Sequence, residues 1–552
     1  MRKEMFVIPI LVLALTAVSG EQTMGLFLNE ADSYKGYTLF SPISSRTTYL
    51  INNEGMLVNS WNSEYTPAMM AYLSEGGYLY RLISLDSVNS RLRYNYAGVE
   101  KMDWEGKVLW HYEYGSDDYV CHHDIATLPN GNVLLIACEA KDSIECIQAG
   151  RDSRTLNGEP LLVDYLIEIR PVGDSGADVV WEWHLWNHLI TEVDSTNDNY
   201  GDVEEHPDHI DINYQGYRSG TNDWTHFNSV AYNEEFDQIM VSSFSFGEIW
   251  VIDHSTTTSQ ARGHTGGRYG KGGDILYRWG NPQTYDAGGL KDEKLYQQHD
   301  AQWIPQGIPG AGNILVFNNG SPRGYSSVDE IVPPVDAEGN YHLEGSRFGP
   351  QEPMWSYTAP NPPDLFAPVF SGEQRLPNGN TLICDGPRGD FIEVTPEGNM
   401  VWRYVNPVNQ YGPATQGDSV PNNLVFKVRR YAPDYPGLED RDLNPKGPIE
   451  KYSDVVEDEP DNRVELKVYP APSISTANVA YHLSMSGHVS LNMYNITGQK
   501  VRTLVNEVKP AGYYQIAWDG TDDLGHRLSS GVYFIKLEAG KETLKERIVL
   551  IR

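Results

Sequence analysis

The chain repeats one strand pattern, and this repeat constrains the fold more than any other feature. The copy at residues 375–407, "RLPNGNTLICDGPRGDFIEVTPEGNMVWRYVNP", reads as four short strands with turns at Asn-Gly and Pro-Glu-Gly-Asn, the last strand ending on tryptophan. Five further copies, two of them looser, precede it. A recurring four-stranded meander is typical of propeller blades. The sequence therefore predicts an all-β fold, with a closed six-bladed β-propeller over residues 30–440.

Composition agrees with β-structure and narrows the partners. The chain has 51 glycines, 33 prolines and 35 tyrosines, and its apolar residues fall in short runs between turn signals. The formal net charge is -33, from 42 basic and 75 acidic residues. A charge of this sign repels nucleic acid and anionic membranes, so we expect neither as a partner.

The N-terminus predicts export. Residues 1–20 combine basic Arg2 and Lys3, an apolar run too short for a comfortable membrane span, and small residues at the end, as in a signal peptide. No membrane span is expected after its removal. Export permits disulfides, and a Cys138–Cys146 pair is conceivable. No CxxC pair occurs, which gives thiol-redox or zinc-thiolate chemistry little support.

Three kinds of segment do not follow the repeat pattern: insertions, a linker and a C-terminal unit. Long insertions such as residues 188–223 interrupt the repeats, and we expect these insertions to form functional rims or lids. Residues 441–463 are rich in proline and acid and read as a linker. Residues 464–552 alternate apolar and polar side chains over about seven short strands, which predicts a small C-terminal Ig-like β-sandwich.

Histidines recur at matching positions of different repeats. His123 of "CHHD" and His299 of "QQHD" stand six residues before the proline of the following turn, while His226 of "WTHFN" shares the register of His122. These positions begin the innermost strands, which line the channel of a propeller, so we expect the histidines to converge there. Strand alternation predicts that His122 and His123 point to opposite faces.

Clustered imidazoles allow two chemistries. A histidine nitrogen can accept a group covalently and pass it on, or three histidines can bind zinc or copper. The neighbouring Asp124, Asp300 and Asn228 could orient the rings or act as braces between blades. Six other histidines of the propeller region are assigned to structural positions or loops: His184, His188, His206, His209, His254 and His264.

Taken in order, the motifs "CHHDIATLPNGN", "DWTHFNSVAYNEEFD", "GGDILYRWGNP", "QQHDAQWIP" and "RLPNGNTLI" resemble the bacterial aryl-sulfate sulfotransferases. The resemblance implies ping-pong transfer of a sulfuryl group from a phenolic sulfate ester to a phenol. It needs no cofactor, and the chain has no Walker-type loop. Carried over by motif, His299 would be the nucleophile. His226, Asn228 and either His122 or His123 would bind sulfate oxygens or exchange the phenol proton.

One residue departs from the family pattern. Phe244 of "SSFSFGEIW" stands where characterised members have an arginine, and a phenyl ring cannot clamp sulfate as a guanidinium does. Arg323 or Arg388 could replace that cation, although each alone reads more readily as a surface or inter-blade ion pair. Otherwise the site binds a different anion or has lost activity.

The C-terminal stretch 487–540 resembles the sorting domains of type IX secretion and the related FlgD-like immunoglobulin fold. The resemblance implies secretion machinery as a partner, and a secreted or cell-surface location reached through the bacterial periplasm.

Two other functions stay open. Phe244, with aromatic rims around Trp183, Trp186 and Trp224, is compatible with a non-catalytic propeller that binds a phenolic, sulfated or glycan ligand. The same channel histidines could instead serve a metal-dependent enzyme.

Overall fold

The computed structural model describes residues 22–88, 92, 95–452, 465–469, 477–483, 486–510, 512–518, 520–540 and 542–550. The expected signal peptide and residues 453–463 of the expected linker lie outside these residues. One compact unit spans Gln22–Lys451, and the described residues after it belong to a second. Among the described residues, no helix is both long and apolar enough to cross a membrane.

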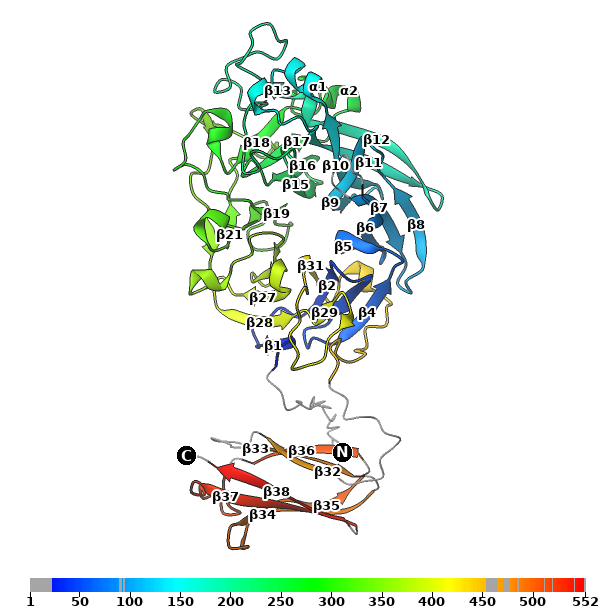
Figure 1. Cartoon of the computed structure of the whole chain (residues 1–552), viewed down its shortest axis with the longest axis vertical. Coiled ribbons are helices and arrows are strands. Elements are labelled where there is room, and N and C mark those ends of the chain that lie inside the picture. Colours follow the sequence, from blue (N-terminus) through cyan, green and yellow to red (C-terminus); the bar gives the residue numbers. More distant parts are fainter. Residues whose placement is uncertain are drawn as a thin grey trace, which may run out of the picture. The chain divides into compact units, whose positions relative to one another are not determined.

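Six large antiparallel sheets form most of the unit Gln22–Lys451 (Figure 1). The first three contain, in spatial order, β31 (Val425–Tyr431), β2 (Tyr37–Pro42), β3 (Thr47–Ile51) and β4 (Leu57–Asn62); β5 (Thr66–Leu73), β6 (Leu79–Val88), β7 (Asn95–Met102) and β8 (Val108–Glu113); and β9 (Tyr119–Thr127), β10 (Val133–Lys141), β11 (Leu161–Val172) and β12 (Gly176–His184).

The other three sheets follow the same order along the chain. They contain β15 (Phe227–Asn233), β16 (Gln238–Ser243), β17 (Glu248–Asp253) and β18 (Ile275–Trp279); β19 (His299–Trp303), β20 (Ile314–Asn318), β21 (Ser327–Ile331) and β24 (Trp355–Tyr357); and β25 (Gly372–Arg375), β26 (Thr381–Asp385), β27 (Asp390–Val394) and β28 (Met400–Val405), to which β1 (Gly25–Asn29) adds a fifth strand.

The first strand of each sheet contacts the first strands of its two neighbours. These contacts run from β31 through β5, β9, β15, β19 and β25 back to β31, around the centre seen in Figure 1. The two ends of the unit are interlocked, because β31 pairs with β2 and β1 pairs with β28. The contacts between the first strands therefore close into a ring.

A tryptophan from each sheet joins it to the next one. In every case the indole N–H donates to a backbone carbonyl of the following sheet or of a loop attached to it, and the sixth bond returns to the first sheet. The pairs are Trp61 with Asp103, Trp110 with Gly176, Trp183 with Gly273, Trp279 with Pro350, Trp355 with Pro396, and Trp402 with Asn53. The tryptophan that ends each repeat therefore packs apolar surface and satisfies its N–H in one contact.

Short elements decorate the sheets. The helices are α1 (Ser143–Gln148) and α2 (Thr258–Ala261), and the 3-10 turns are η1 (Ser153–Thr155), η2 (Leu185–Asn187), η3 (Pro282–Tyr285), η4 (Ser321–Arg323), η5 (Pro362–Asp364), η6 (Gly386–Arg388) and η7 (Pro436–Leu438). Three two-stranded sheets lie in insertions: β13 (Leu189–Ile190) with β14 (Ile210–Asp211), β22 (Leu343–Glu344) with β23 (Arg347–Phe348), and β29 (Val408–Asn409) with β30 (Gly412–Pro413).

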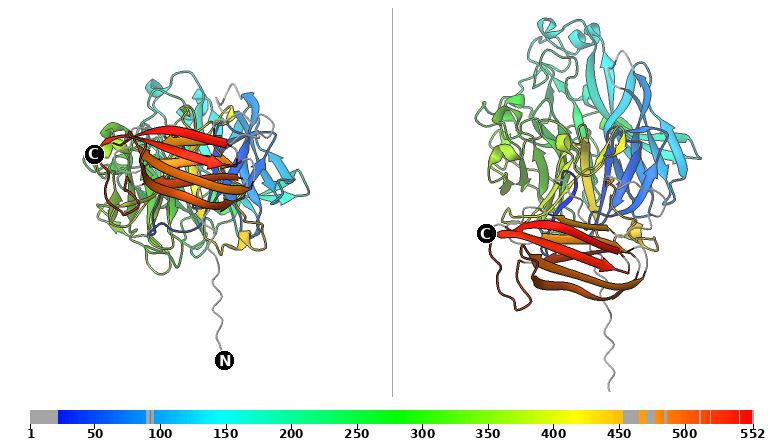
Figure 2. Two further views of the ribbon diagram at one scale, coloured as in Figure 1. Left: turned by 90° about the horizontal axis from the view of Figure 1, so that it is seen from below. Right: turned by 60° about the horizontal axis from the view of Figure 1, so that its bottom comes forward.

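The C-terminal unit has two sheets, which Figure 2 shows as two layers. One contains β32 (Glu465–Tyr469), β33 (Ala477–Leu483) and β36 (Gly512–Trp518), and the other β35 (Lys500–Lys509), β34 (Gly487–Asn495), β37 (Gly531–Ala539) and β38 (Glu542–Leu550). Both contribute to one buried cluster that includes Val479, Trp518, Leu491 and Ile535.

The disulfide considered between Cys138 and Cys146 is not formed. All four cysteines are free and buried. Cys138 packs with residues of β6 and β9, whereas Cys146 on α1 belongs to a different apolar cluster, so the two thiols serve separate cores.

Candidate functional site

The structure brings the four candidate histidines together at the centre of the first unit. His122 and His123 lie in β9, His226 immediately precedes β15, and His299 begins β19. The rings of His123 and His226 are 4.6 Å apart, centroid to centroid. The Phe244 ring packs against both His226 and His299, with ring centroids 5.1 Å and 5.6 Å apart, respectively. Residues of three sheets therefore meet in one small, largely buried group, here called the histidine cluster.

The expectation that His122 and His123 point to opposite faces is wrong. Their Nδ1 atoms are 2.7 Å apart, which is a hydrogen bond. The cause is local backbone geometry: His123 has a φ of 58°, in the left-handed region, and the pairing of β9 with β10 shifts register next to it. His226 has the same conformation, with a φ of 52°. Such bulges re-aim side chains that regular alternation would separate.

His299 is held in one tautomer. Its Nδ1 lies 2.8 Å from Oδ1 of Asn319 and 3.2 Å from the carbonyl oxygen of Gln297. The Asn319 amide nitrogen donates to the Ala367 carbonyl, so Oδ1 is its acceptor end. Both partners of Nδ1 are acceptors, and Nδ1 must carry the proton. The lone pair therefore resides on Nε2. Burial lowers the pKa of His299 to about 4, which keeps the ring neutral near pH 7.

His122 orients His123 from behind. Nε2 of His122 lies 3.0 Å from Oδ1 of Asp164, whose other oxygen accepts from Thr225 and from the backbone N–H of Phe227. An N–H directed at this carboxylate leaves Nδ1 of His122 to accept the proton of His123. Burial, followed by the neighbouring imidazoles, holds the pKa of His123 well below its usual value. Of the two, it is His123 whose ring contacts His226.

His226 belongs to a charged triad. Its Nδ1 lies 2.8 Å from Oδ2 of Asp223, and the same oxygen is 3.1 Å from the Arg218 guanidinium. Burial alone would raise the pKa of Asp223, but His226 and Arg218 outweigh it and lower the pKa to about 2. The ionised carboxylate fixes a proton on Nδ1 of His226. Nε of Arg218 is buried without a hydrogen-bond partner among the described residues.

The aspartates that follow His123 and His299 have a different task. The Lys427 ammonium lies 2.7 Å from Oδ2 of Asp124 and 2.8 Å from Oδ1 of Asp300, and all three side chains are buried. Arg429 also binds Asp300, at 2.6 Å. Lys427 and Arg429 both lie on β31, so one strand ties β9 to β19 through charge. In "QQHD", the histidine therefore joins the histidine cluster, and the aspartate joins the buried ion-pair network.

The other predicted site residues lie outside the histidine cluster. Asn228 is fully buried, and its side-chain amide donates to the carbonyl of Gln298, the residue before His299, at 2.7 Å. It therefore links two segments of backbone and does not join the histidine cluster. Arg323 contacts Ser327 and the rings of Tyr296 and Tyr325. Arg388 contacts Asp385 and the Asp364 carbonyl. Neither Arg323 nor Arg388 therefore supplies, beside Phe244, the positive charge of the missing family arginine.

No sequence pattern pointed to several groups that build the site: Asp164, Asp223, Arg218, Asn319, Lys427, and Phe426, whose ring packs against His123 and His299. Of these, Asn319 had a usable signal, because it immediately follows β20, the strand that pairs with the His299 strand. Arg218 lies in the insertion after β14 and carries no repeat signal. Of the expected aromatic rims, Trp183 and Trp224 are buried with their N–H groups bonded, and Trp186 lines a cavity.

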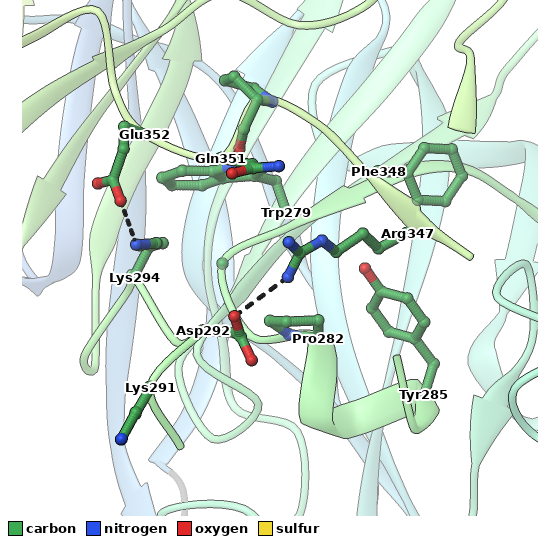
Figure 3. Close-up of a pocket in the computed structure, with 12 residues that line it drawn as sticks. Trp279, Pro282, Tyr285, Lys291, Asp292, Lys294, Arg347, Phe348, Gln351 and Glu352 are labelled. Carbon is green, nitrogen blue, oxygen red and sulfur yellow. Dashed lines mark hydrogen bonds and ion pairs between the residues drawn. The ribbon is translucent and has the colours of Figure 1, made fainter. Parts of the chain in front are cut away.

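A second cavity lies between the fourth and fifth sheets. Its volume is about 260 Å³, and Figure 3 shows the aromatic rings of Trp279, Tyr285 and Phe348 with three basic side chains. Two of these are paired: Arg347 with Asp292 at 3.1 Å, and Lys294 with Glu352 at 2.6 Å. Lys291 is the third. The cavity combines flat apolar surface with positive charge, and no residue of the histidine cluster lines it.

The histidine cluster holds imidazoles in fixed orientations within a protein built almost entirely of β-strands. A site of this kind is suited to group transfer. The sequence matches the profile of the family described as Arylsulfotransferase (ASST) over residues 69–410, and that of the FlgD Ig-like domain over residues 453–543. The chain belongs to the arylsulfotransferase family. Family membership supports arylsulfotransferase activity and small-molecule phenolic substrates. No curated protein sequence matches the chain.

Solved structures show only distant likeness. A protein of unknown function from Bacteroides caccae is 12% identical, with 72% of this chain and 99% of that one covered and a TM-score of 0.39. Virginiamycin B lyase from Staphylococcus aureus is 9% identical, with 71% and 91% covered and a TM-score of 0.32. FlgD from P. aeruginosa is 24% identical over 15% of this chain and 70% of its own, with a TM-score of 0.13.

Proposed function

We propose that this protein is an exported arylsulfotransferase in which the six sheets are the blades of a closed propeller and His299 carries the sulfuryl group covalently. The observation that carries the proposal is the fixed tautomer of His299. A neutral imidazole whose Nδ1 is protonated and bonded presents the Nε2 lone pair, which is the form a nucleophile needs. No nucleotide donor is involved.

The transfer has two halves. In the first, Nε2 of His299 attacks the sulfur of an aryl sulfate ester. The N–S bond forms as the bond from sulfur to the aryl oxygen breaks, and protonated His226 gives its Nε2 proton to the departing phenolate. In the second, the acceptor phenol returns a proton to His226, and its oxygen attacks sulfur as the N–S bond breaks. The Asp223 carboxylate supports both protonation states of His226.

Arg218 replaces the missing family cation in this scheme. Its guanidinium is anchored by Asp223 beside His226, and its buried Nε is a donor without a partner among the described residues. Sulfuryl transfer spreads negative charge over the peripheral oxygens, so a positioned cation lowers the barrier. Phe244, packed between His226 and His299, would then offer apolar surface to the aromatic ring of the donor.

The test is release of nitrophenol from 4-nitrophenyl sulfate by the full chain, with and without added phenol. We expect release that phenol accelerates, and its loss in His299→Ala. His342→Ala is the matched control, because His342 is an exposed imidazole on a loop. Absence of release from folded natural protein, or equal rates in natural protein and His299→Ala, would overturn the proposal.

A binding function is the second candidate, and the cavity of Figure 3 favours it. Aromatic faces and lysine or arginine side chains together suit a phenolic, sulfated or glycan ligand. In that case 4-nitrophenyl sulfate would bind without turnover, its Kd would rise in Lys291→Ala, and it would be unchanged in His299→Ala.

Export and sorting complete the proposal. Residues 1–20 would direct the chain to the periplasm, and the C-terminal unit would hand it to a secretion machinery that delivers it to the cell surface or medium. Fractionation of cells expressing the full chain, or a chain ending before residue 464, measures this. Equal release of both forms would contradict a sorting role.

A further inference from the structure

A second group of histidines lies apart from the histidine cluster, at the outer edge of the fourth sheet. His188 and His209 precede β13 and β14, whose parallel pairing sets them side by side; the Ile210 N–H donates to the His188 carbonyl at 2.9 Å. His264 lies in the loop after α2, and Asp274 precedes β18. Three segments far apart in sequence therefore meet, and we call these four residues the rim group.

The nitrogens of the rim group converge on one oxygen. Oδ1 of Asp274 lies 2.8 Å from Nδ1 of His188, 2.7 Å from Nδ1 of His264 and 3.9 Å from Nε2 of His209. The ligand atoms of His188, His264 and Asp274 all lie within 4.8 Å of one another. Asp274 is 4% exposed and His188 is fully buried, so these two side chains lie in the interior, whereas His264 is half-exposed and reaches the surface.

The outer hydrogen bonds of these rings aim lone pairs inward. Nε2 of His188 lies 2.9 Å from the Ala261 carbonyl and must donate to it, which leaves the lone pair on Nδ1. Nδ1 of His209 lies 2.9 Å from Asp208, which leaves the lone pair on Nε2. When the rings are neutral, these two lone pairs face the Asp274 carboxylate, and either a proton or a metal ion between nitrogen and oxygen balances its charge. Carbonyl or carboxylate partners on the far nitrogen are the usual support of metal-binding imidazoles.

Local packing holds this geometry. The Trp183 indole stacks on His188, with centroids 5.5 Å apart and planes 5° from parallel. A Cβ at Gly273 would lie 2.7 Å from Nε2 of His188, so only glycine permits this approach. His209 and His264 also line a cavity of about 440 Å³, which gives the group an open side.

We propose that His188, His209, His264 and Asp274 bind one divalent transition-metal ion, with zinc as the best match. Three imidazoles and one carboxylate form a borderline donor set that suits zinc in tetrahedral geometry. Metal-ligand distances near 2.0 Å require ligand atoms about 3.3 Å apart. Nδ1 of His188 and Nδ1 of His264 would therefore move about 0.5 Å away from Oδ1 of Asp274, and Nε2 of His209 about 0.6 Å toward it, to admit the ion. Bound there, the ion fastens the β12–β15 insertion to the β17–β18 loop and can take a small ligand from the cavity.

The test uses the full chain, stripped with a chelator and titrated with Co²⁺, whose tetrahedral complexes absorb strongly in the visible range. We expect one Co²⁺ per chain, displaced by Zn²⁺, and a Kd raised at least 10-fold in His264→Asn. His264 is half-exposed, so this variant keeps the fold, which circular dichroism verifies.

Two results would overturn the proposal: no tetrahedral Co²⁺ spectrum from the folded natural chain, or an unchanged Kd in His264→Asn. His206→Asn is the matched control, because His206 lines the same cavity and forms an alternative group with Asp208 and His209. Loss of binding in His206→Asn with full binding in His264→Asn would assign the ion to that other group. Sulfuryl transfer does not pass through this site, so the outcome is independent of the proposed function.

Discussion

Replacing Lys427 by methionine should destabilise the first unit strongly. The ammonium lies 2.7 Å from Asp124 and 2.8 Å from Asp300, and each attraction is worth about 6 kcal/mol before desolvation at an effective dielectric constant of 20. Arg429 still neutralises Asp300 in the variant, but Asp124 keeps only neutral donors, Tyr72 and the backbone of Val230. Breaking a buried pair in this way costs about 3–5 kcal/mol.

The assay is the midpoint of urea unfolding of the full chain, followed by tryptophan fluorescence. Lys294→Met is the control, because its pair with the exposed Glu352 is worth at most about 1 kcal/mol. Adding Asp124→Asn to Lys427→Met should recover part of the loss, since a buried amide costs less than an unpaired carboxylate. A change below about 1 kcal/mol in Lys427→Met, or no recovery in the double variant, would refute the account of the buried network.

Three further predictions concern catalysis. Asn319→Leu should lower kcat for 4-nitrophenyl sulfate 10- to 100-fold with little change in KM, because His299 loses the acceptor that sets its tautomer; equal tautomer populations by NMR in both proteins would contradict this. Arg218→Gln should lower kcat/KM about 100-fold or more through the lost charge, and an unchanged value would remove Arg218 from the site. Burial lowers the pKa of His299 to about 4, so the acid limb of kcat/KM should lie near pH 4, not at the ordinary 6.5. Between pH 4 and 6.5, His299 is protonated in the unfolded chain but neutral in the folded one. The contribution of His299 to the free energy of unfolding therefore rises with pH over this range.

The repeat tryptophans explain why the sheet pattern was readable. Each repeat carries its own turns and a terminal aromatic, and Trp61 and Trp402 make the same bond to the next sheet. Information of this kind is local and recurs with the repeat, so inspection of one chain is enough to find it. The same holds for the register of His123 and His299, which placed both on strands at the centre.

Tertiary structure decided what the repeat could not encode. His122 contacts His123 because of a left-handed residue in a bulge, a feature without a period. Arg218 reaches His226 from an insertion, and Lys427 joins two aspartates from β31, which lies at the far end of the unit's sequence. The histidines of the rim group, assigned from sequence to structural positions or loops, converge only after β13 pairs with β14. The sequence by itself determined the strands, their turns and the central position of the histidines, because these depend on short-range patterns. Proton positions, charge partners and the rim group depend on contacts between segments that only the closed fold brings together.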